Sequence, residues 1–453
     1  MRRLAPLLSM VAVVVMLWVT SAVAAEVKVE PGAAGADAFV AAAGCTCHGP
    51  LVQQWSRSMH NQALTDPIYL TKLEEAKKAT DGKLGPFCLK CHGPVAVMAG
   101  QAEGERSPSA ANAVGCSFCH QVVGIDGHPG NTNQIVETDG IRRAQIKDPQ
   151  APHPAQYSEL HEKAEFCGAC HNVMHPINGM HLESTYEEWS KSPYAEEGVV
   201  CQDCHMSAAP GQRGPAKGSA AVGAPQRDNI YQMTFVGANR ILGPADAAEA
   251  MLKSAATMEI TSQDIVAPGS ESSLSVKITN SGAGHYLPTG LTEVRQMWLE
   301  VYAESDAGST KLGERRFGTV LADDKGNHPV ELWDATQIHS DDRIPPKQSV
   351  TADFKFDMPE GQTDLNLKAV LKYQSVDDEF AAKAGVDNPV TEMAVAQAAV
   401  YDSEQTKATA QAEQAKQEQG GGGAPNTLVV GLGALSAVAI AAGVFFLTRG
   451  RAS

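Results

Sequence analysis

The chain has 453 residues and a formal net charge of −16 at neutral pH. A chain of this length is too long for one compact core, so two or more folding units are expected, and its content of 43% hydrophobic and 19% charged residues excludes wholesale disorder. The acidic balance argues against a nucleic-acid-binding protein, because such proteins need basic surface, and it favours basic protein partners.

Residues 1–25 have the pattern of an export signal. Arg2 and Arg3 precede an apolar run from Leu7 to Val19, and Ala22-Val23-Ala24 provides small residues for cleavage. An uncleaved anchor is the alternative interpretation. Export would place the ten cysteines in a compartment where disulfides can form, so disulfides have to be considered as their role.

Residues 26–250 contain all ten cysteines, and eight of these form four C-x-x-C-H motifs: "CLKCH" (88–92), "CSFCH" (116–120), "CGACH" (167–171) and "CQDCH" (201–205). This is the attachment pattern of haem c, in which two thiols on one side of a helical turn bond to the porphyrin and the histidine binds the iron. Zinc sites and redox disulfides are alternatives, but neither requires a histidine after each pair. The predicted attachment residues are Cys88, Cys91, Cys116, Cys119, Cys167, Cys170, Cys201 and Cys204, with proximal ligands His92, His120, His171 and His205.

A shortened copy of the motif, "CTCHG" (45–49), precedes the other four. On a helix the thiols of Cys45 and Cys47 would point about 200° apart, so Cys45 needs a non-helical backbone to reach the same porphyrin. Three outcomes are open: two thioethers on a distorted turn, attachment through Cys47 alone, or an empty site. The histidine that follows in "WSRSMH" (55–60) favours a fifth haem here, with His48 as its proximal ligand.

The sixth ligand of each iron separates closed electron carriers from haems that are open to a substrate. Six histidines before residue 250 remain after the five proximal ones, which is enough for bis-histidine ligation throughout: His60, His128, His153, His161, His175 and His181. His128 and His175 closely follow their own motifs and are expected to serve other haems. Met59, Met98 and Met206 are possible sulfur ligands. About 45 residues per haem is too little chain for a conventional core, so the haems themselves are expected to form it, wrapped by short helices and irregular loops.

Together these segments resemble the multihaem c-type cytochromes of the cytochrome c-552/4 kind. The likeness spans most of residues 44–206 and is carried by "CTCHGPLVQQWSRSMHNQALTDP" and, more specifically, by "CGACHNVMHPINGMHLESTYEEWSKSPYAEEGVVCQDCHM". The resemblance implies bis-histidine haems that pass electrons between partners, and it implies that His60 is a distal ligand. The shortened first motif departs from the family pattern.

Residues 251–402 contain no cysteine and predict an all-β unit. Four segments alternate apolar and polar residues between turn residues: 273–280, 296–304, 349–358 and 365–375. They predict an antiparallel, immunoglobulin-like β-sandwich, and "NSGAGHYLPTG" (280–290) and "DDRIPPKQS" (341–349) resemble parts of the sandwich that follows the haem region in some of these cytochromes. His285 either reaches back to a haem as a distal ligand or hydrogen-bonds its own turn; His328 and His339 have weaker claims.

The C-terminal segments predict a tether and a membrane anchor. Residues 403–426 have the composition of a flexible or partly helical linker, and residues 427–448 include twenty uncharged residues, from Leu428 to Leu447, enough for one transmembrane helix. Arg449 and Arg451 in the tail 449–453 place that tail in the cytoplasm, with the haem and sandwich units on the periplasmic side of the cytoplasmic membrane. A sorting signal whose tail is removed is the alternative.

The predicted fold class is multidomain: a mainly helical and irregular multihaem domain, an all-β sandwich and one C-terminal transmembrane helix. The predicted function is electron transfer through four or five haem c groups, between membrane partners such as a quinol-oxidising complex and periplasmic redox proteins. A multihaem oxidoreductase acting on a small nitrogen or sulfur compound at one open haem is the alternative, and the CTCH site is the predicted place for it. A structural or adhesion role is a third hypothesis.

Overall fold

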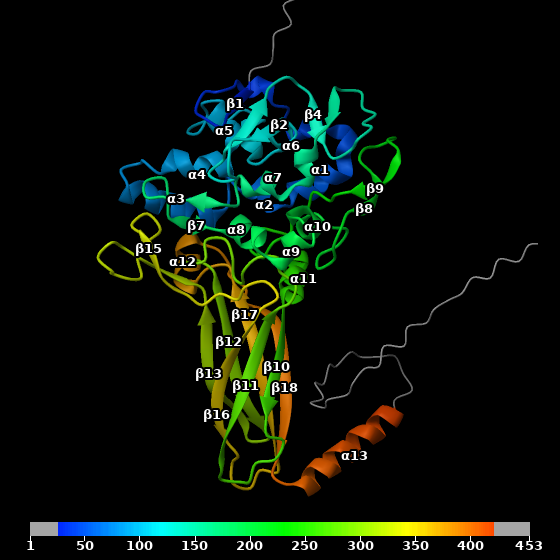
Figure 1. Cartoon of the computed structure of the whole chain (residues 1–453), viewed down its shortest axis with the longest axis vertical. Coiled ribbons are helices and arrows are strands. Elements are labelled where there is room, and N and C mark those ends of the chain that lie inside the picture. The colour runs from blue at the N-terminus through cyan, green and yellow to red at the C-terminus, as the bar shows by residue number, and fades with distance from the viewer. Residues whose placement is uncertain (1–25, 421–453) are drawn as a thin grey trace, which may run out of the picture.

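The computed structural model describes residues 26–420, which form two units stacked along the long axis of the molecule (Figure 1). The upper unit consists of short helices, short strands and long connections, and the lower unit consists of long antiparallel strands. The predicted export signal, transmembrane segment and cytoplasmic tail lie outside the described residues, as does the end of the predicted linker.

The upper unit is built from elements that are mostly shorter than two helical turns. Its α-helices are α1 (Gly49–Ser56), α2 (Met59–Gln62), α3 (Pro67–Ala79), α4 (Gly85–His92), α5 (Pro94–Met98), α6 (Cys116–Cys119), α7 (Ala164–Gly168), α8 (Thr185–Ser190), α9 (Pro193–Glu196) and α10 (Cys201–His205). Its 3-10 helices are η1 (Ala36–Ala38), η2 (Ala42–Gly44), η3 (Thr46–His48), η4 (Ala110–Asn112) and η5 (Glu159–Glu162). Its strands are β1 (Glu26–Lys28), β2 (Val122–Ile125), β3 (Gln134–Glu137), β4 (Arg142–Ala144), β5 (Ala155–Tyr157), β6 (Val173–Met174), β7 (His181–Glu183), β8 (Ala216–Ser219) and β9 (Gln226–Ile230).

Four of these helices carry the attachment motifs. Because i and i+3 lie on one face of a helix, α4, α6 and α10 turn the two thiols of each motif to one side. Helix α7 carries Cys167 and ends at Gly168, so Cys170 lies in the turn that follows it. The apolar side chains of the upper unit form only small clusters, one around Phe39, Met98 and Phe118 and another around Leu64 and Leu89. Such small clusters are typical of a unit whose fold depends on more than its own side chains.

The lower unit consists of two antiparallel sheets that share one hydrophobic core. Its strands are β10 (Ala256–Ser262), β11 (Glu271–Asn280), β12 (Gln296–Ser305), β13 (Gly308–Phe317), β14 (Thr319–Ala322), β15 (Gln337–Asp341), β16 (Ser349–Asp357), β17 (Asp364–Gln374) and β18 (Thr391–Tyr401). One of these sheets has the order β10-β11-β16 and the other β13-β12-β17-β18, while β14 and β15 pair in a separate two-stranded sheet. The alternating apolar residues of both face inward, as with Val276 and Ile278 of β11 and Leu299 of β12, which belong to the same buried cluster.

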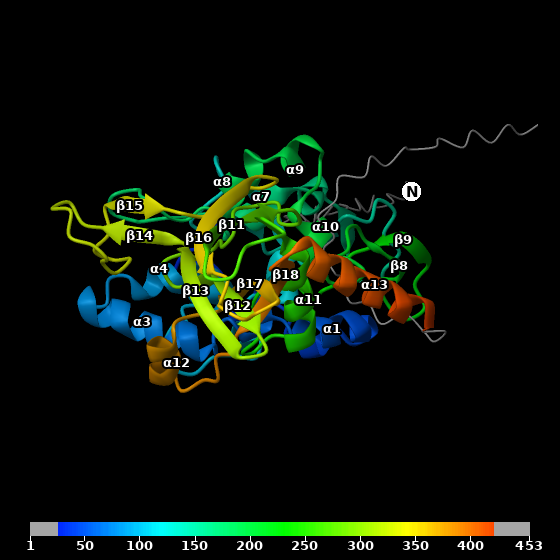
Figure 2. The same cartoon turned by 90° about the horizontal axis from the view of Figure 1, so that it is seen from below.

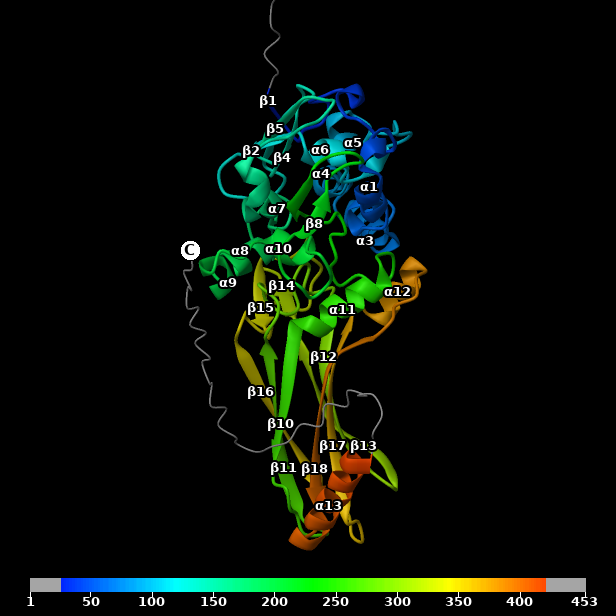
Figure 3. The ribbon, with the colours of Figure 1, turned by 90° about the vertical axis from the view of Figure 1, so that its right-hand side faces the viewer.

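The two units meet through α11, α12 and the loops at the upper end of the sheets. Helix α11 (Ala245–Ala255) leads directly into β10 (Figure 3), and α12 (Asp378–Ala384) lies beside α3 of the upper unit (Figure 2). Ile68 of α3 and Ala381 of α12 share a small apolar cluster, and Lys72 of α3 pairs with Glu331 at 2.9 Å. The junction is therefore both apolar and polar.

The chain leaves the sheets at the end that lies farthest from the upper unit. Helix α13 (Glu404–Gly420) follows β18 there (Figure 1), so the first part of the predicted linker is helical. Between residues 26 and 420, none of the helices combines the length and apolar character needed to span a bilayer.

Candidate haem-binding site

The five motifs define five sites, which we number along the chain. Sites 1 to 5 are Cys45, Cys47 and His48; Cys88, Cys91 and His92; Cys116, Cys119 and His120; Cys167, Cys170 and His171; and Cys201, Cys204 and His205. All ten cysteines are unpaired in the structure, so the disulfide alternative has no support from it. Within residues 26–420, histidine, cysteine and carboxylate side chains do not gather in threes or fours, as a zinc site needs.

Four of the five proximal histidines face a second histidine from a distant part of the chain. The ring centroids lie 6.2 Å apart for His48 and His153, 6.4 Å for His171 and His60, 5.9 Å for His120 and His161, and 6.3 Å for His205 and His285. An iron bound end-on between two imidazoles would separate their centroids by about 6.3 Å, taking metal–nitrogen bonds of about 2.0 Å. The spacing of all four pairs therefore fits a haem iron.

Hydrogen bonds fix the orientation of every proximal ring. The Nδ1 atoms of His48, His92, His120 and His205 bond the backbone carbonyls of Ala220, Ala63, Arg143 and Val236 at 2.6–3.0 Å. His171 Nδ1 instead bonds Glu183 Oε1 at 3.2 Å. Because Nδ1 carries the proton in these bonds, Nε2 keeps its lone pair for a metal.

The electrostatic surroundings keep most of these rings neutral. Burial lowers the pKa of His60 to about 3 and those of His92, His161 and His205 to about 4, because a cation loses its hydration there. A neutral imidazole is the form that binds iron. Burial also acts on His171, but the Glu183 carboxylate outweighs it and raises the pKa of His171 to about 9.

The hydrogen bonds of His161 show whether this residue can bind the iron of site 3. Its Nε2 lies 3.1 Å from the Cys119 carbonyl, while its Nδ1 is buried and has no partner among the described residues. A buried nitrogen without a partner is costly, and a metal bond would satisfy it. His161 can thus offer Nδ1 to the iron of site 3.

Site 2 differs from the other four. The ring of His92 stacks on Tyr69 of α3, with centroids 3.6 Å apart and planes 6° from parallel, which leaves no room for an iron between them. None of the histidine pairs found in the described residues includes His92. Tyr69 therefore supports one face of the proximal ring, and bis-histidine ligation at site 2 stays a prediction.

Three predicted distal ligands face no proximal ring in the described residues. His128 is exposed and pairs with Glu187. His175 is buried: its Nδ1 accepts from the backbone N–H groups of Ile177 and Asn178, and its Nε2 has no partner among the described residues. His181 is exposed at the start of β7. His328 and His339 stack on each other at 3.5 Å, and Met98 is packed in an apolar cluster.

The shortened motif of site 1 has the backbone that its spacing demands. Cys45 has φ −88° and ψ 42°, between η2 and η3, so it lies outside both helical turns. The Cys45 thiol contacts Cys116 of site 3, while Cys47 is exposed. With His48 facing His153, site 1 has the same kind of imidazole pair as sites 3, 4 and 5.

Cysteines of different sites lie close enough to act on one another. The side-chain contacts are Cys45 with Cys116, Cys91 with Cys170, and Cys167 with Cys201. Cys119 of site 3 also acts electrostatically on both cysteines of site 4. Site 4 therefore occupies the centre, next to sites 2, 3 and 5, and site 1 follows beyond site 3.

Sequence reasoning missed the residues that support these ligands. Four supporting residues belong to no haem-attachment motif and contact the sites only through residues distant in the sequence: Tyr69, Glu183, Glu188 and Arg343. The one local signal was the position of Glu183 and Glu188 inside the segment that carries the family resemblance.

Comparisons with known proteins agree with this arrangement. Residues 44–121 match the family model "Cytochrome c554 and c-prime". The fold is similar to the crystal structure of a penta-heme cytochrome c552 from Thermochromatium tepidum, with a TM-score of 0.60 and 20% identity over 83% of this chain and 100% of that chain.

A further similarity covers about a third of the chain. The CARDB domain of a Pyrococcus furiosus protein matches 32% of this chain and 85% of its own at 16% identity and a TM-score of 0.19, too low to carry an argument. No curated protein sequence matches. The family match and the penta-heme structure identify the fold as that of a multihaem c-type cytochrome and support haem c as its cofactor.

Proposed function

We propose that the protein is an electron carrier that is anchored in the cytoplasmic membrane and conducts electrons through five adjacent haem c groups on the periplasmic side. The four imidazole pairs at 5.9–6.4 Å are the observation that supports it most directly. Each haem, when bound, supplies an iron that accepts and releases one electron. The protein side chains hold the irons close together and block both faces of four of them.

The order of the sites gives the route. Electrons that enter at site 1 would pass site 3 to reach the central site 4, from which sites 2 and 5 lead to other surfaces. The side chains of the chain do no covalent chemistry on this route; they fix the spacing and orientation of the groups they hold.

The proposals of a membrane anchor and of redox partners are supported by the sequence and by the shape of the described residues. The uncharged run from Leu428 to Leu447 follows α13, which leaves the sheets at the end opposite the haem unit (Figure 1). Strand β17 alone has 11 residues, which is about 35 Å of extended chain. The sheets would thus hold the haems away from the bilayer, where periplasmic proteins and protruding domains of a quinol-oxidising complex can reach them.

Haem counting tests the proposal. The intact mass of the exported protein should exceed that of the polypeptide by five haem increments, and a reductant should convert all five to the ferrous spectrum of haem c. The Cys45→Ser and Cys47→Ser variants show whether site 1 uses one or two thioethers. A colourless protein, or one with zinc in place of iron, would refute the proposal.

Site 2 supports a second candidate function. Because His92 faces no second imidazole among the described residues, an iron there could bind a small nitrogen or sulfur compound and reduce or oxidise it. We place this possibility at site 2, although the sequence favoured the CTCH motif of site 1. Carbon monoxide should then bind one ferrous haem of the five, and the His92→Met variant should change that signal alone. Failure of carbon monoxide to bind would exclude this second function.

A further inference from the structure

The proximal ligand of site 4 has a hydrogen-bond partner unlike those of the other sites. His171 Nδ1 bonds the carboxylate of Glu183, whereas the other four proximal histidines bond neutral backbone carbonyls. A negative acceptor draws the Nδ1 proton away from the ring more strongly than a carbonyl does, so it increases the electron density on Nε2. Site 4 is also the central site.

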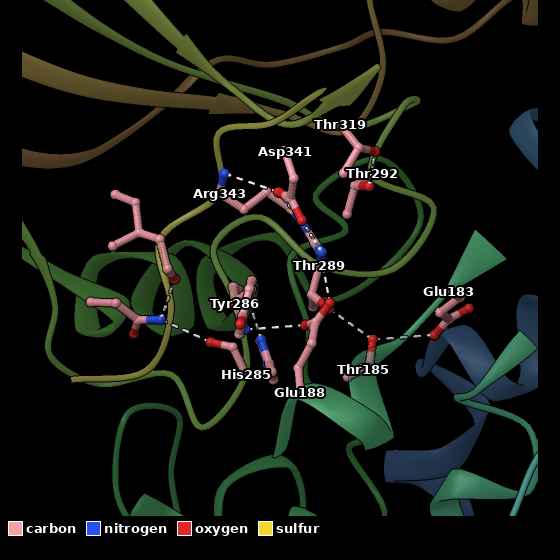
Figure 4. A network of polar contacts seen from close by, with 12 residues as sticks. Glu183, Thr185, Glu188, His285, Tyr286, Thr289, Thr292, Thr319, Asp341 and Arg343 are labelled. Atoms are coloured by element: carbon pink, nitrogen blue, oxygen red, sulfur yellow. Dashed lines mark hydrogen bonds and ion pairs between the residues drawn. The ribbon is translucent and has the colours of Figure 1, made fainter. Parts of the chain in front are cut away.

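Glu183 is held in place from both units of the molecule. Thr185 Oγ1 lies 3.4 Å from Glu183 Oε1 and 2.8 Å from Thr289 Oγ1, and Thr289 in turn donates to Glu188 at 2.7 Å (Figure 4). Thr289 comes from the loop between β11 and β12 of the lower unit. The Glu183 side chain is 16% exposed, so water competes little for its oxygen atoms.

The other charged groups near Glu183 leave this bond intact. Arg295 and His92 are the nearest of them besides His171. Arg295 attracts the carboxylate, but its guanidinium donates to the Ser375 carbonyl at 2.9 Å. His92 belongs to site 2, and burial keeps its ring neutral. The negative charge of Glu183 therefore acts chiefly on the His171 ring.

We propose that Glu183 lowers the reduction potential at site 4 and makes this central site the last of the four imidazole-paired sites to be reduced. A more basic axial ligand favours ferric over ferrous iron. This inference rests on the proposed electron-transfer function. It adds that electrons collect at the outer sites, and that crossing the central site is the uphill step between them.

The Glu183→Gln variant tests this, because glutamine keeps an acceptor oxygen and removes the charge. In a spectroelectrochemical titration of the full-length protein, the lowest midpoint of the low-spin haems should rise by about 59 mV, the equivalent of a tenfold change in the ferric/ferrous ratio for one electron. The other midpoints should stay in place. The matched control is Glu187→Gln, whose carboxylate pairs with Lys191 and His128 and contacts no paired ligand; it should move none.

If the Glu183→Gln variant loses haem, a second variant still tests the proposal. His60 faces His171 across site 4, and His60→Met should raise the potential of that site alone, because methionine ligation raises haem potentials. The midpoint that moves should be the lowest of the low-spin set. The inference is overturned if a higher midpoint moves, or if Glu183→Gln retains five haems with unchanged midpoints. The latter result would leave the electron-transfer proposal standing, whereas absence of redox-active haem would remove both.

Discussion

His285 belongs to the lower unit but is the candidate distal ligand of a site in the upper unit. It lies in a loop of the lower unit, yet its ring faces His205 of site 5 at 6.3 Å. We expect His285→Ala to convert one low-spin haem into a high-spin one, visible in the absorption and electron paramagnetic resonance spectra. His328→Ala is the control, because His328 is exposed and stacks only on His339. Unchanged spectra of His285→Ala would mean that this histidine merely bonds its own turn.

Glu188 positions the His285 loop. Its buried carboxylate accepts from the backbone N–H of Tyr286 at 3.1 Å and from Thr289 at 2.7 Å, and it pairs with Arg343 (Figure 4). The two charged side chains are only 5% and 8% exposed.

Removal of Glu188 should be costly, because the partly buried N–H of Tyr286 loses its acceptor and Arg343 keeps only Asp341 as an ionic partner. We expect Glu188→Ala to destabilise the protein by about 1–3 kcal/mol and to weaken the low-spin signal of site 5. Thermal unfolding and the haem spectrum measure both effects. The exposed Glu379→Gln should change neither, and a stable Glu188→Ala protein with an unaltered spectrum would show that the loop is held by other contacts.

At the scale of elements, the sequence predicted those helices and strands whose conformation depends on the spacing of neighbouring residues. The spacing of each C-x-x-C-H motif predicted thiols on one helical face, and α4 and α10 carry them in this way. The four alternating segments predicted as strands lie in β11, β12, β16 and β17. Strand β18 was missed because its alanine-rich sequence has little strand propensity and depends on pairing with β17 for its conformation.

The pairing of ligands could not be predicted, since it depends on contacts between distant segments. His60 follows site 1 in the chain but faces His171 of site 4, and His285 faces His205 across two units. His175 and His181 looked equivalent to His161 in the sequence. Only the fold shows that the ring of His161 faces His120 of site 3, whereas backbone N–H groups occupy the Nδ1 atom of His175.

Glu293, in the turn before β12, gives the protein a pH-dependent stability. Burial raises the pKa of Glu293 to about 7, and its Oε1 has no partner among the described residues. Between its ordinary pKa of 4.5 and about 7, the folded state retains a proton that the unfolded chain has released. The contribution of Glu293 to stability is therefore full below the lower value and is lost as the pH rises through the higher one.

The Glu293→Gln variant should remove this dependence. We expect its free energy of unfolding to exceed that of the native sequence by about 2–3 kcal/mol at pH 8 and to differ little at pH 4. Denaturant titrations at the two pH values measure the difference, and Glu379→Gln again serves as an exposed control. Equal effects at both pH values would show that the side chain acts through packing and not through its charge.

At the scale of the whole molecule, the two units do different work. The upper unit holds the five sites together. The lower unit places His285 opposite the proximal histidine of site 5, supplies a hydroxyl to the network around Glu183, and separates the upper unit from α13. Separation of the units would therefore alter sites 4 and 5 and leave sites 1 and 3 intact, because the pairs at sites 1 and 3 lie wholly within the upper unit.

The central claim is that five haem irons lie in one array, four of them between two imidazoles and the fifth, at His92, without a second one. A Mössbauer spectrum of the oxidised, iron-enriched protein counts both kinds of iron directly. We expect four low-spin ferric irons for every high-spin one. Four irons in total, five low-spin irons, or two or more high-spin irons of the five would contradict this account.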